Sequence, residues 1–366
     1  MPGPTAGSAA PSGRGRSLAQ VYRRFGEVDA AGTSPLYERV AVALSESDEA
    51  LRAIEAVPAR KRHPTVVLAA LHDLALSGRA PALAAAYAAA DGDAAAAAAI
   101  DTLLRMTGPV VALAVRRRPR TDGTGRCAVL YPAVAAAAQR TGANTVGLID
   151  VACSAGFNLT VDRVGITYSN GQSLGDPSSP VRLSSSIVGN RAVPARAMPE
   201  VVARVGVDRD PVDVTDAGDA RWLRACLPPD QPERAARLDA EIALAATAPP
   251  RLLRGDAVEM LPEAVARVPA DALPVVTTTW ALSRFPLESR RRFLQRLDDA
   301  AAGRPVAWVS AEGVGVAPAI PALGDRRASG HSIIGLALFD RSARHAEALG
   351  RCWSRGRSLA WLAGSS

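Results

Sequence analysis

The stretch Gly147-Leu-Ile-Asp150-Val-Ala-Cys-Ser-Ala-Gly156-Phe-Asn158-Leu decides how the chain is interpreted. Its apolar first half is typical of a buried strand, and an acidic residue, small residues and the start of a helix follow. Small side chains let a ligand approach backbone N–H groups that a bulky residue would cover. We therefore expect a ligand site at the end of this strand, although a tight strand-to-helix turn without a ligand explains the same residues.

Other short β-branched runs follow along the chain and alternate with helical stretches. Together with the first run they span residues 146–151, 201–207, 251–253, 275–279 and 306–310. Such alternation predicts a parallel sheet that binds ligands at the carboxyl ends of its strands. Two later apolar segments, 333–339 and 358–362, are expected to close one edge of the sheet as a pair. The predicted fold class is α/β, with a Rossmann-like, methyltransferase-type, mostly parallel sheet.

The N-terminal third has a different pattern. Residues 1–16 are rich in Gly, Pro, Ser and Ala and are expected to form a disordered tail, whereas residues 17–120 have helical periodicity and predict an all-α region. Residues 121–366 are then the Rossmann-like domain. Within it, residues from about 165 to 198 lack helical periodicity. We expect an extended loop there that acts as a lid over the sheet.

The amino-acid composition limits the kinds of binding partner that we expect. The net charge is +7, and because Lys61 is the only lysine, almost all 43 basic residues are arginines. Arginine suits small anions and acidic proteins, while an aromatic content of 4% offers no stacking platform for single-stranded nucleic acid. Nucleic acid is therefore disfavoured as a partner. With no apolar run of membrane length and no apolar segment at the start, we expect a cytoplasmic protein without a membrane anchor.

The cysteines and histidines give no sign of a metal site. The four cysteines form no Cys-X-X-Cys pair, and the four histidines show no spacing typical of metal ligands. We therefore expect neither a metal centre nor a disulfide framework.

Acidic residues follow three of the predicted strands, where folds of this type hold a nucleotide cofactor. With the small residues after the first strand, they define the candidate cofactor-binding set. Its members are Asp150, Ala152, Ser154, Gly156, Asn158, Asp208 and Asp256.

The fourth and fifth strands supply candidates for the substrate side. Trp280 and Thr278 lie where one wall of a substrate pocket is expected, and Glu312 can hold an amine or take its proton. A core tryptophan and a solvated loop acid explain these two residues equally well. The candidate catalytic residues are Glu312, Trp280 and Asp122. Arg126, in a polar turn before a helix, completes an anion-binding set with Thr278 and Arg284.

Several motifs together resemble one family. They are Asp150-Val-Ala-Cys-Ser-Ala-Gly-Phe-Asn-Leu, Asp162-Arg163, Val205-Gly-Val-Asp208, Arg221-Trp222-Leu and Gly255-Asp256-Ala. From Ser34 onward the chain resembles the mainly actinobacterial domain-of-unknown-function family numbered 2332. The resemblance implies a core similar to that of class I S-adenosylmethionine (SAM) methyltransferases. Ala152 stands where the first glycine of their cofactor motif usually lies.

Three functions in actinobacterial, specialised metabolism fit these features. The first is methyl transfer from SAM to a small molecule. The second needs no cofactor: an amine displaces sulfate within one molecule, as in aziridine ring formation, while an acidic carrier protein presents the substrate to the basic surface. The third is a non-catalytic subunit that supports a partner.

Overall fold

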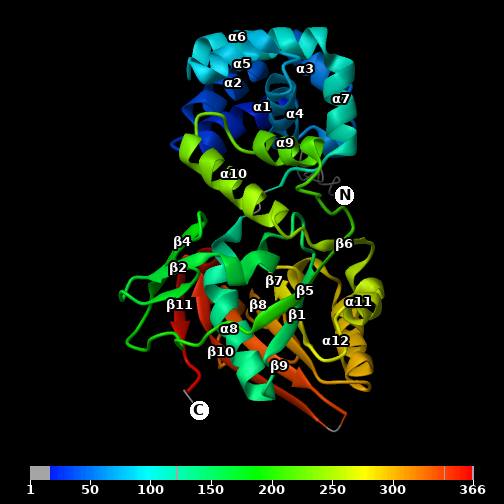
Figure 1. Cartoon of the computed structure of the whole chain (residues 1–366). Helices are drawn as coiled ribbons and strands as arrows, with labels where there is room; N and C mark the ends of the chain where they lie inside the picture. The colour runs from blue at the N-terminus through cyan, green and yellow to red at the C-terminus, as the bar shows by residue number, and fades with distance from the viewer. Residues whose placement is uncertain (1–16, 121–122, 342, 365–366) are drawn as a thin grey trace, which may run out of the picture. The chain divides into compact units, whose positions relative to one another are not determined.

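The computed structural model describes residues 17–120, 123–341 and 343–364 (Figure 1). The expected tail at 1–16 and the candidate residue Asp122 lie outside the described residues. The chain divides into two compact units. The first comprises the chain up to Pro119 and the segment Arg221–Ala235; the second comprises Arg120–Ala220 and the chain from Ala236 onward. That residues 221–235 return to the first unit was not predicted from the sequence.

The first unit is helical. Ser34 and Ser47 cap two of its helices by accepting hydrogen bonds from backbone N–H groups, and Pro35 begins the first of the two. Its apolar core includes Tyr22, Leu44 and Leu71. The helices are α1 (Leu18–Arg24), α2 (Pro35–Glu46), α3 (Asp48–Glu55), α4 (Pro64–Leu76), α5 (Pro81–Ala88), α6 (Gly92–Arg105) and α7 (Thr107–Arg116).

The segment 221–235 belongs to the first unit because its side chains bond there. The indole Nε1 of Trp222 donates to the carbonyl oxygen of Arg118 at 2.8 Å. The carboxylate of Asp230 accepts from Ser34 Oγ at 2.6 Å and from Leu36 N at 3.0 Å. The boundaries of the segment fall within α9 (Ala217–Ala225) and α10 (Pro232–Ala246).

In the second unit, the described residues form one sheet of eleven strands in the order β3-β2-β4-β11-β10-β9-β8-β7-β1-β5-β6. Six of the ten strand pairs are parallel, which confirms the expected mixed α/β class with a mostly parallel sheet. The strands are β1 (Thr145–Val151), β2 (Gly165–Tyr168), β3 (Ser173–Gly175), β4 (Arg182–Ile187), β5 (Glu200–Asp208), β6 (Arg251–Arg254), β7 (Leu273–Thr279), β8 (Val306–Gly313), β9 (Ser332–Phe339), β10 (Arg344–Trp353) and β11 (Ser358–Trp361).

Helices cover both faces of the parallel part of this sheet. Successive side chains of a strand point to opposite faces. Leu148 of β1 therefore packs with α8 (Cys127–Thr141), while Ile149 packs with α11 (Ala257–Ala266) and α12 (Leu287–Ala301). After β1 the chain forms β2, β3 and β4 at the far edge of the sheet, then adds β5 and β6 on one side of β1, and then β7 and β8 on the other. The strand order thus reverses at β1, and ligands of open α/β sheets bind at such a point.

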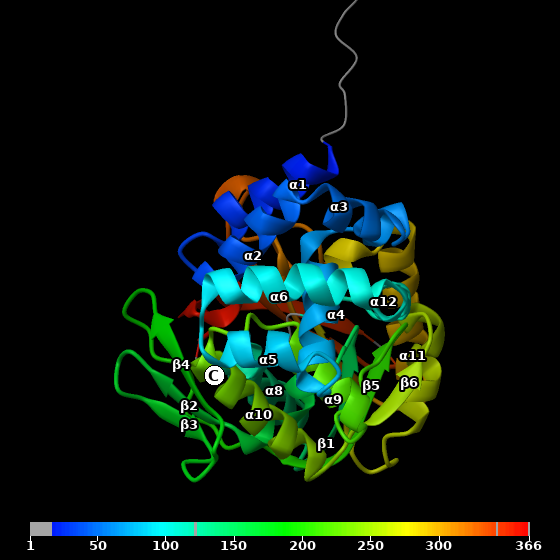
Figure 2. The ribbon, with the colours of Figure 1, turned by 90° about the horizontal axis from the view of Figure 1, so that it is seen from above.

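Three expectations from the sequence are wrong. The segment 165–198 is not an extended loop, because it contributes β2, β3 and β4 to the sheet (Figure 2). The segments 333–339 and 358–362 do not pair at an edge, because β10 lies between β9 and β11, and β11 pairs with β4. No α-helix follows β1; a short 3-10 helix, η4 (Phe157–Arg163), stands there instead.

Among the described residues, no single helix has the length and apolar character needed to cross a membrane. Two sharply bent pairs, α4 with α5 and α6 with α7, meet that test only when each pair is taken together.

Candidate functional site

The ends of β1 and β7 are joined by a buried polar network. Asp150, 1% exposed, accepts hydrogen bonds from Asn158 Nδ2 at 3.1 Å and from Thr277 Oγ1 at 2.7 Å. The same Asn158 nitrogen donates to Thr279 Oγ1 at 3.1 Å, whereas Asn158 Oδ1 is buried without a partner among the described residues. Asp150 and Asn158, both candidate cofactor-binding residues, are thus hydrogen-bonded to each other, and the carboxylate is held inside the protein.

Arg126 and Trp280 extend this network toward the surface. Arg126 precedes α8 and donates from Nη1 to Thr279 Oγ1 at 3.1 Å. Its guanidinium carbon lies 5.6 Å from the centroid of the Trp280 ring, a distance typical of a cation–π contact. Trp280 Nε1 donates to Ser332 Oγ at 2.8 Å, which fixes the ring. A positive charge is therefore held beside an aromatic face at the end of β7.

The backbone of the two strand ends is strained. Ala152, Ser154 and Trp280 have φ angles of 57°, 53° and 53°, in the left-handed region that L-residues avoid. Each such conformation costs about 1–2 kcal/mol, and residues of this kind cluster at functional sites. Their position after β1 and β7 therefore supports a site where the strand order reverses.

Glu312, near the end of β8, is the acid with the most unusual surroundings. It is 1% exposed, so the alternative of a solvated loop acid is wrong. Its Oε1 accepts hydrogen bonds from Ala281 N at 2.9 Å and Leu282 N at 3.0 Å, whereas its Oε2 has no partner among the described residues. Burial raises the pKa of this carboxyl group. Glu312 therefore has one oxygen that two backbone N–H groups hold and one buried oxygen that has no partner among the described residues.

The other predicted acids already have partners within the chain. The carboxylate of Asp208 accepts from Ser154 N at 3.0 Å and Asp210 N at 2.8 Å. Asp256 caps α11 through Val258 N at 3.0 Å. It also pairs with Arg209 at 2.6 Å, and this guanidinium lowers the pKa of Asp256.

Thr278 and Arg284 are not part of the network. Thr278 is buried, and its Oγ1 accepts from Trp308 Nε1 at 3.0 Å, so it points into the opposite face of the sheet from its neighbours. Thr278 as an anion-binding residue stays a prediction. Arg284 is exposed at the end of η5 (Leu282–Arg284), and its charge acts on Glu312 from there. Gly156 has a φ of 72° and lies next to Pro250.

A family model described as "Uncharacterized protein conserved in bacteria (DUF2332)" matches residues 19–361. The chain belongs to this family. The comparisons with curated proteins and with solved structures found no match. Membership of DUF2332 confirms the family resemblance of the motifs. The methyltransferase-like nature of the core and the restriction to actinobacteria stay predictions.

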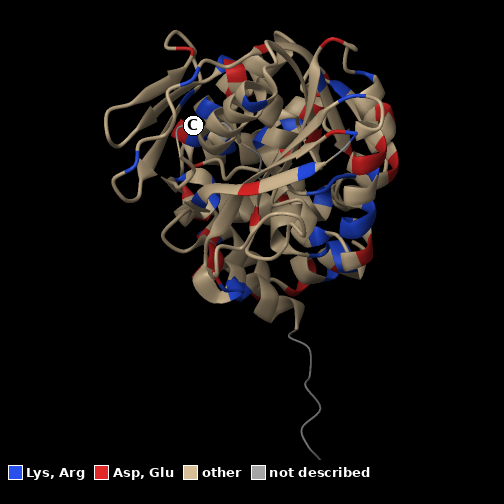
Figure 3. Ribbon diagram, turned by 90° about the horizontal axis from the view of Figure 1, so that it is seen from below, with Lys and Arg blue, Asp and Glu red and all other residues tan. Residues whose placement is uncertain are grey.

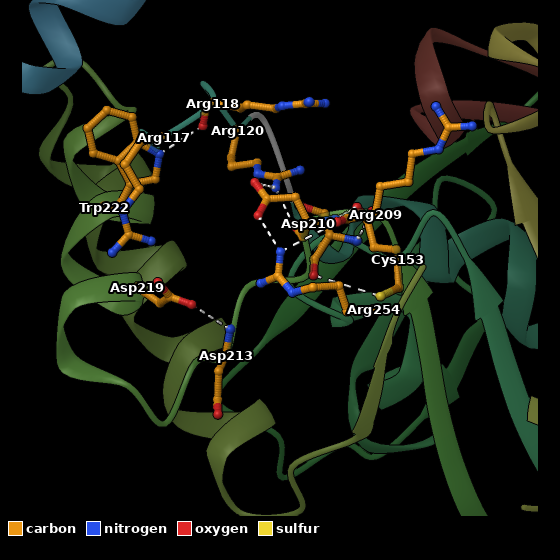
Figure 4. Close-up of polar contacts among 12 residues, drawn as sticks. Arg117, Arg118, Arg120, Cys153, Arg209, Asp210, Asp213, Asp219, Trp222 and Arg254 are labelled. Carbon is orange, nitrogen blue, oxygen red and sulfur yellow. Dashed lines mark hydrogen bonds and ion pairs between the residues drawn. The ribbon is translucent and has the colours of Figure 1, made fainter. Parts of the chain in front are cut away.

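In this DUF2332 protein, a second charged cluster lies beyond Asp208 (Figure 4). Asp210 receives Arg120 Nη2 and Arg254 Nη1, each at 3.0 Å from one carboxylate oxygen. The turn after β5 is therefore tied both to β6 and to the segment that leads toward α8. Among the described residues, no group of three or more metal-ligating side chains gathers.

A cavity of about 1020 Å³ in the DUF2332 chain is lined in part by Arg126. Of the predicted site residues, Arg126 alone is among its described lining residues. Four further arginines line it, and the sequence analysis missed them because they come from segments far apart in the chain. The repeated serines at 184–186 were the one local signal.

Proposed function

We propose that this DUF2332 protein is a cofactor-independent enzyme that closes a ring in a small molecule by intramolecular displacement. An amine nitrogen attacks a carbon that carries an oxyanion leaving group such as sulfate. The C–N bond forms as the C–O bond breaks, the proton on nitrogen passes to Glu312, and the anion departs toward Arg126. An amine on the adjacent carbon gives an aziridine.

The observation that carries this proposal is the free oxygen of Glu312. A buried carboxylate with a raised pKa is a stronger base than an exposed one, and Oε2 has no hydrogen bond that a substrate would need to break. Arg126 and Glu312 both adjoin the segment that begins at Trp280: Arg126 lies over its ring, and Glu312 bonds to the N–H groups of the next two residues. Glu312 alternates onto the Trp308 face of β8, and Arg126 contacts the other face through Thr279, so the proposed substrate lies across the carboxyl edge of β7 and β8, between base and cation.

Methyl transfer from SAM is the second candidate. The strand order β6-β5-β1-β7-β8, with its reversal at β1, favours it because Rossmann-like methyltransferases share that arrangement. Two features weigh against it. The carboxylates of Asp208 and Asp256 are engaged by the chain itself, and β1 leads into a 3-10 helix rather than a long helix whose N-terminus faces the cofactor.

A sulfate-release assay tests the proposal. The full chain is incubated with 2-aminoethyl hydrogen sulfate and its substituted 1,2-amino sulfate analogues, and free sulfate is measured by ion chromatography with and without SAM. We expect release above the uncatalysed rate, independent of SAM, and a fall of about 100-fold or more in the Glu312→Gln variant. The control Glu263→Gln, in an exposed ion pair on α11, leaves the rate unchanged.

Three results contradict the displacement reaction. These are sulfate release that is equal in the wild type and Glu312→Gln, no release from any of these compounds, and tight binding of SAM in calorimetry. The last of these favours methyl transfer instead.

A further inference from the structure

The cavity beside Arg126 lies wholly within the second unit, among β2, β4, α10 and two short 3-10 helices, η3 (Thr124–Arg126) and η7 (Ser354–Gly356). Its described lining residues include no acidic side chain and five arginines. These are Arg126, Arg182, Arg237, Arg355 and Arg357. All the charged side chains in the described lining are therefore positive.

Hydroxyl groups cover the floor of this cavity. β2 and β4 run parallel, with Thr167 opposite Ser184, and their exposed residues alternate with buried ones. The exposed hydroxyl residues that line the cavity on or next to these strands are Thr167, Ser169, Ser184 and Ser186, and Ser354 of η7 adds another. Each hydroxyl can donate a hydrogen bond to an oxyanion, so these residues complement the arginines of the lining.

Three of the arginines have no acid beside them. Arg237, Arg355 and Arg357 are exposed, and none of them has a carboxylate partner among the described residues. On α11 and α12, by contrast, basic and acidic segments lie next to one another (Figure 3), and Arg267 and Arg292 pair with glutamates of α11. Like charges gathered without counter-charges repel one another, and a bound anion would relieve this repulsion.

Arg355 and Arg357 lie in and next to η7, a turn whose backbone is strained. Ser354 and Arg355 have φ angles of 47° and 57°, which non-glycine residues avoid. At Gly356, with a φ of 97°, a Cβ atom would lie 3.0 Å from the carbonyl oxygen of Gly125, so η7 approaches η3 closely. Ser185 Oγ donates to the Gly356 carbonyl oxygen at 2.8 Å and anchors η7 to β4. A strained turn that is anchored on both sides fixes where Arg355 projects.

We infer that this cavity is a binding site for a small organic polyanion, a compound that carries two or more phosphate or sulfate groups. A volume of about 1020 Å³ is in the range of small-molecule sites and exceeds what one tetrahedral oxyanion fills. Guanidinium groups bind such oxyanions with two parallel hydrogen bonds, and several of them suit several anionic groups. The inference goes beyond the proposed reaction and does not depend on it.

Calorimetric titration of the full chain with inorganic pyrophosphate tests the inference, at an ionic strength of about 50 mM so that screening is weak. The double variant R355A/R357A removes two unpaired arginines of the cavity. The control R291A/R327A removes the same charge from two exposed arginines elsewhere in the second unit. We expect R355A/R357A to raise the Kd for pyrophosphate about tenfold or more, and the control to leave it within about twofold. The bis-sulfate ester of ethylene glycol, titrated in parallel, separates a phosphate-selective from a sulfate-selective site.

An equal loss of pyrophosphate affinity in both double variants overturns the inference, because the net charge of the protein then accounts for the binding. Absence of binding at about 1 mM pyrophosphate and bis-sulfate also overturns it. So does binding of a single-stranded oligonucleotide or an acidic protein through Arg355 and Arg357 when neither small anion binds. Should R355A/R357A fail to fold, as judged by circular dichroism, R237A on the exposed face of α10 gives the same comparison. The Glu312→Gln variant keeps pyrophosphate affinity, so failure of the proposed reaction leaves this result intact.

Discussion

The two carboxylate oxygens of Glu312 lie in different surroundings. Oε1 binds the N–H groups at the start of η5, while Oε2 is buried without a partner among the described residues. Burial raises the pKa in the folded chain, so the folded state holds its proton to higher pH than the unfolded state does. The protonated group makes its full contribution to the free energy of unfolding when the pH is below the pKa of Glu312 in the unfolded chain. This contribution is lost as the pH rises through the pKa of Glu312 in the folded chain.

This linkage gives a prediction for Glu312→Gln, in which the amide oxygen can still accept from Ala281 and Leu282. Between about pH 5 and about pH 8 the wild type should lose about 1–2 kcal/mol of unfolding free energy relative to the variant, because only the wild type must bury a charge. Urea denaturation at both pH values measures the difference. A pH-independent difference between the two proteins would show that the carboxyl group does not titrate abnormally.

At the scale of elements, the hairpin of β2 and β3 depends on one glycine. Gly175 has a φ of 78°, and a Cβ atom there would lie 2.0 Å from the carbonyl oxygen of Val164. Gly171, in the turn of the same hairpin, has a φ of 85° but open space around it. Gly175→Ala should therefore destabilise the chain by about 3 kcal/mol or more, and Gly171→Ala by about 1–2 kcal/mol. Equal losses in thermal or urea unfolding would contradict the clash.

The same elements show what the sequence can and cannot reveal. The strands β1, β5, β6, β7 and β8 were predicted, because buried parallel strands read as apolar, β-branched runs. β4 was missed because its exposed residues are Arg182, Ser184 and Ser186, and β10 because its Arg344-His-Ala-Glu-Ala stretch has no β-branched residue. Asp150 and Asn158 are neighbours in the sequence and could be placed together. The arginines of the cavity could not, because tertiary folding alone brings them side by side.

At the scale of the whole molecule, the first unit is built from two separate parts of the chain. Without 221–235, Asp73 loses its ion pair with Arg221 at 3.0 Å and Arg118 loses the hydrogen bond from Trp222. A fragment of residues 17–119 should therefore be marginally stable alone, since a buried carboxylate without its partner costs several kcal/mol. Adding a peptide of residues 217–236 should raise its Tm, as followed by circular dichroism. An unchanged Tm would mean that the helices up to Arg116 suffice.

Because residues 221–235 belong to the first unit, they also affect how the protein folds during synthesis and how its gene can recombine. A ribosome must deliver more than a hundred further residues after Pro119, including β1 to β5, before the first unit has all its parts. The helices of the first unit are therefore synthesised before residues 221–235, which complete that unit, and the strands β1 to β5 are synthesised in between. Because two separate segments of the chain form the first unit, no single position in the gene divides the coding sequences of the two units. A single recombination event therefore cannot exchange one complete unit for another. The two are expected to have descended together wherever the family occurs.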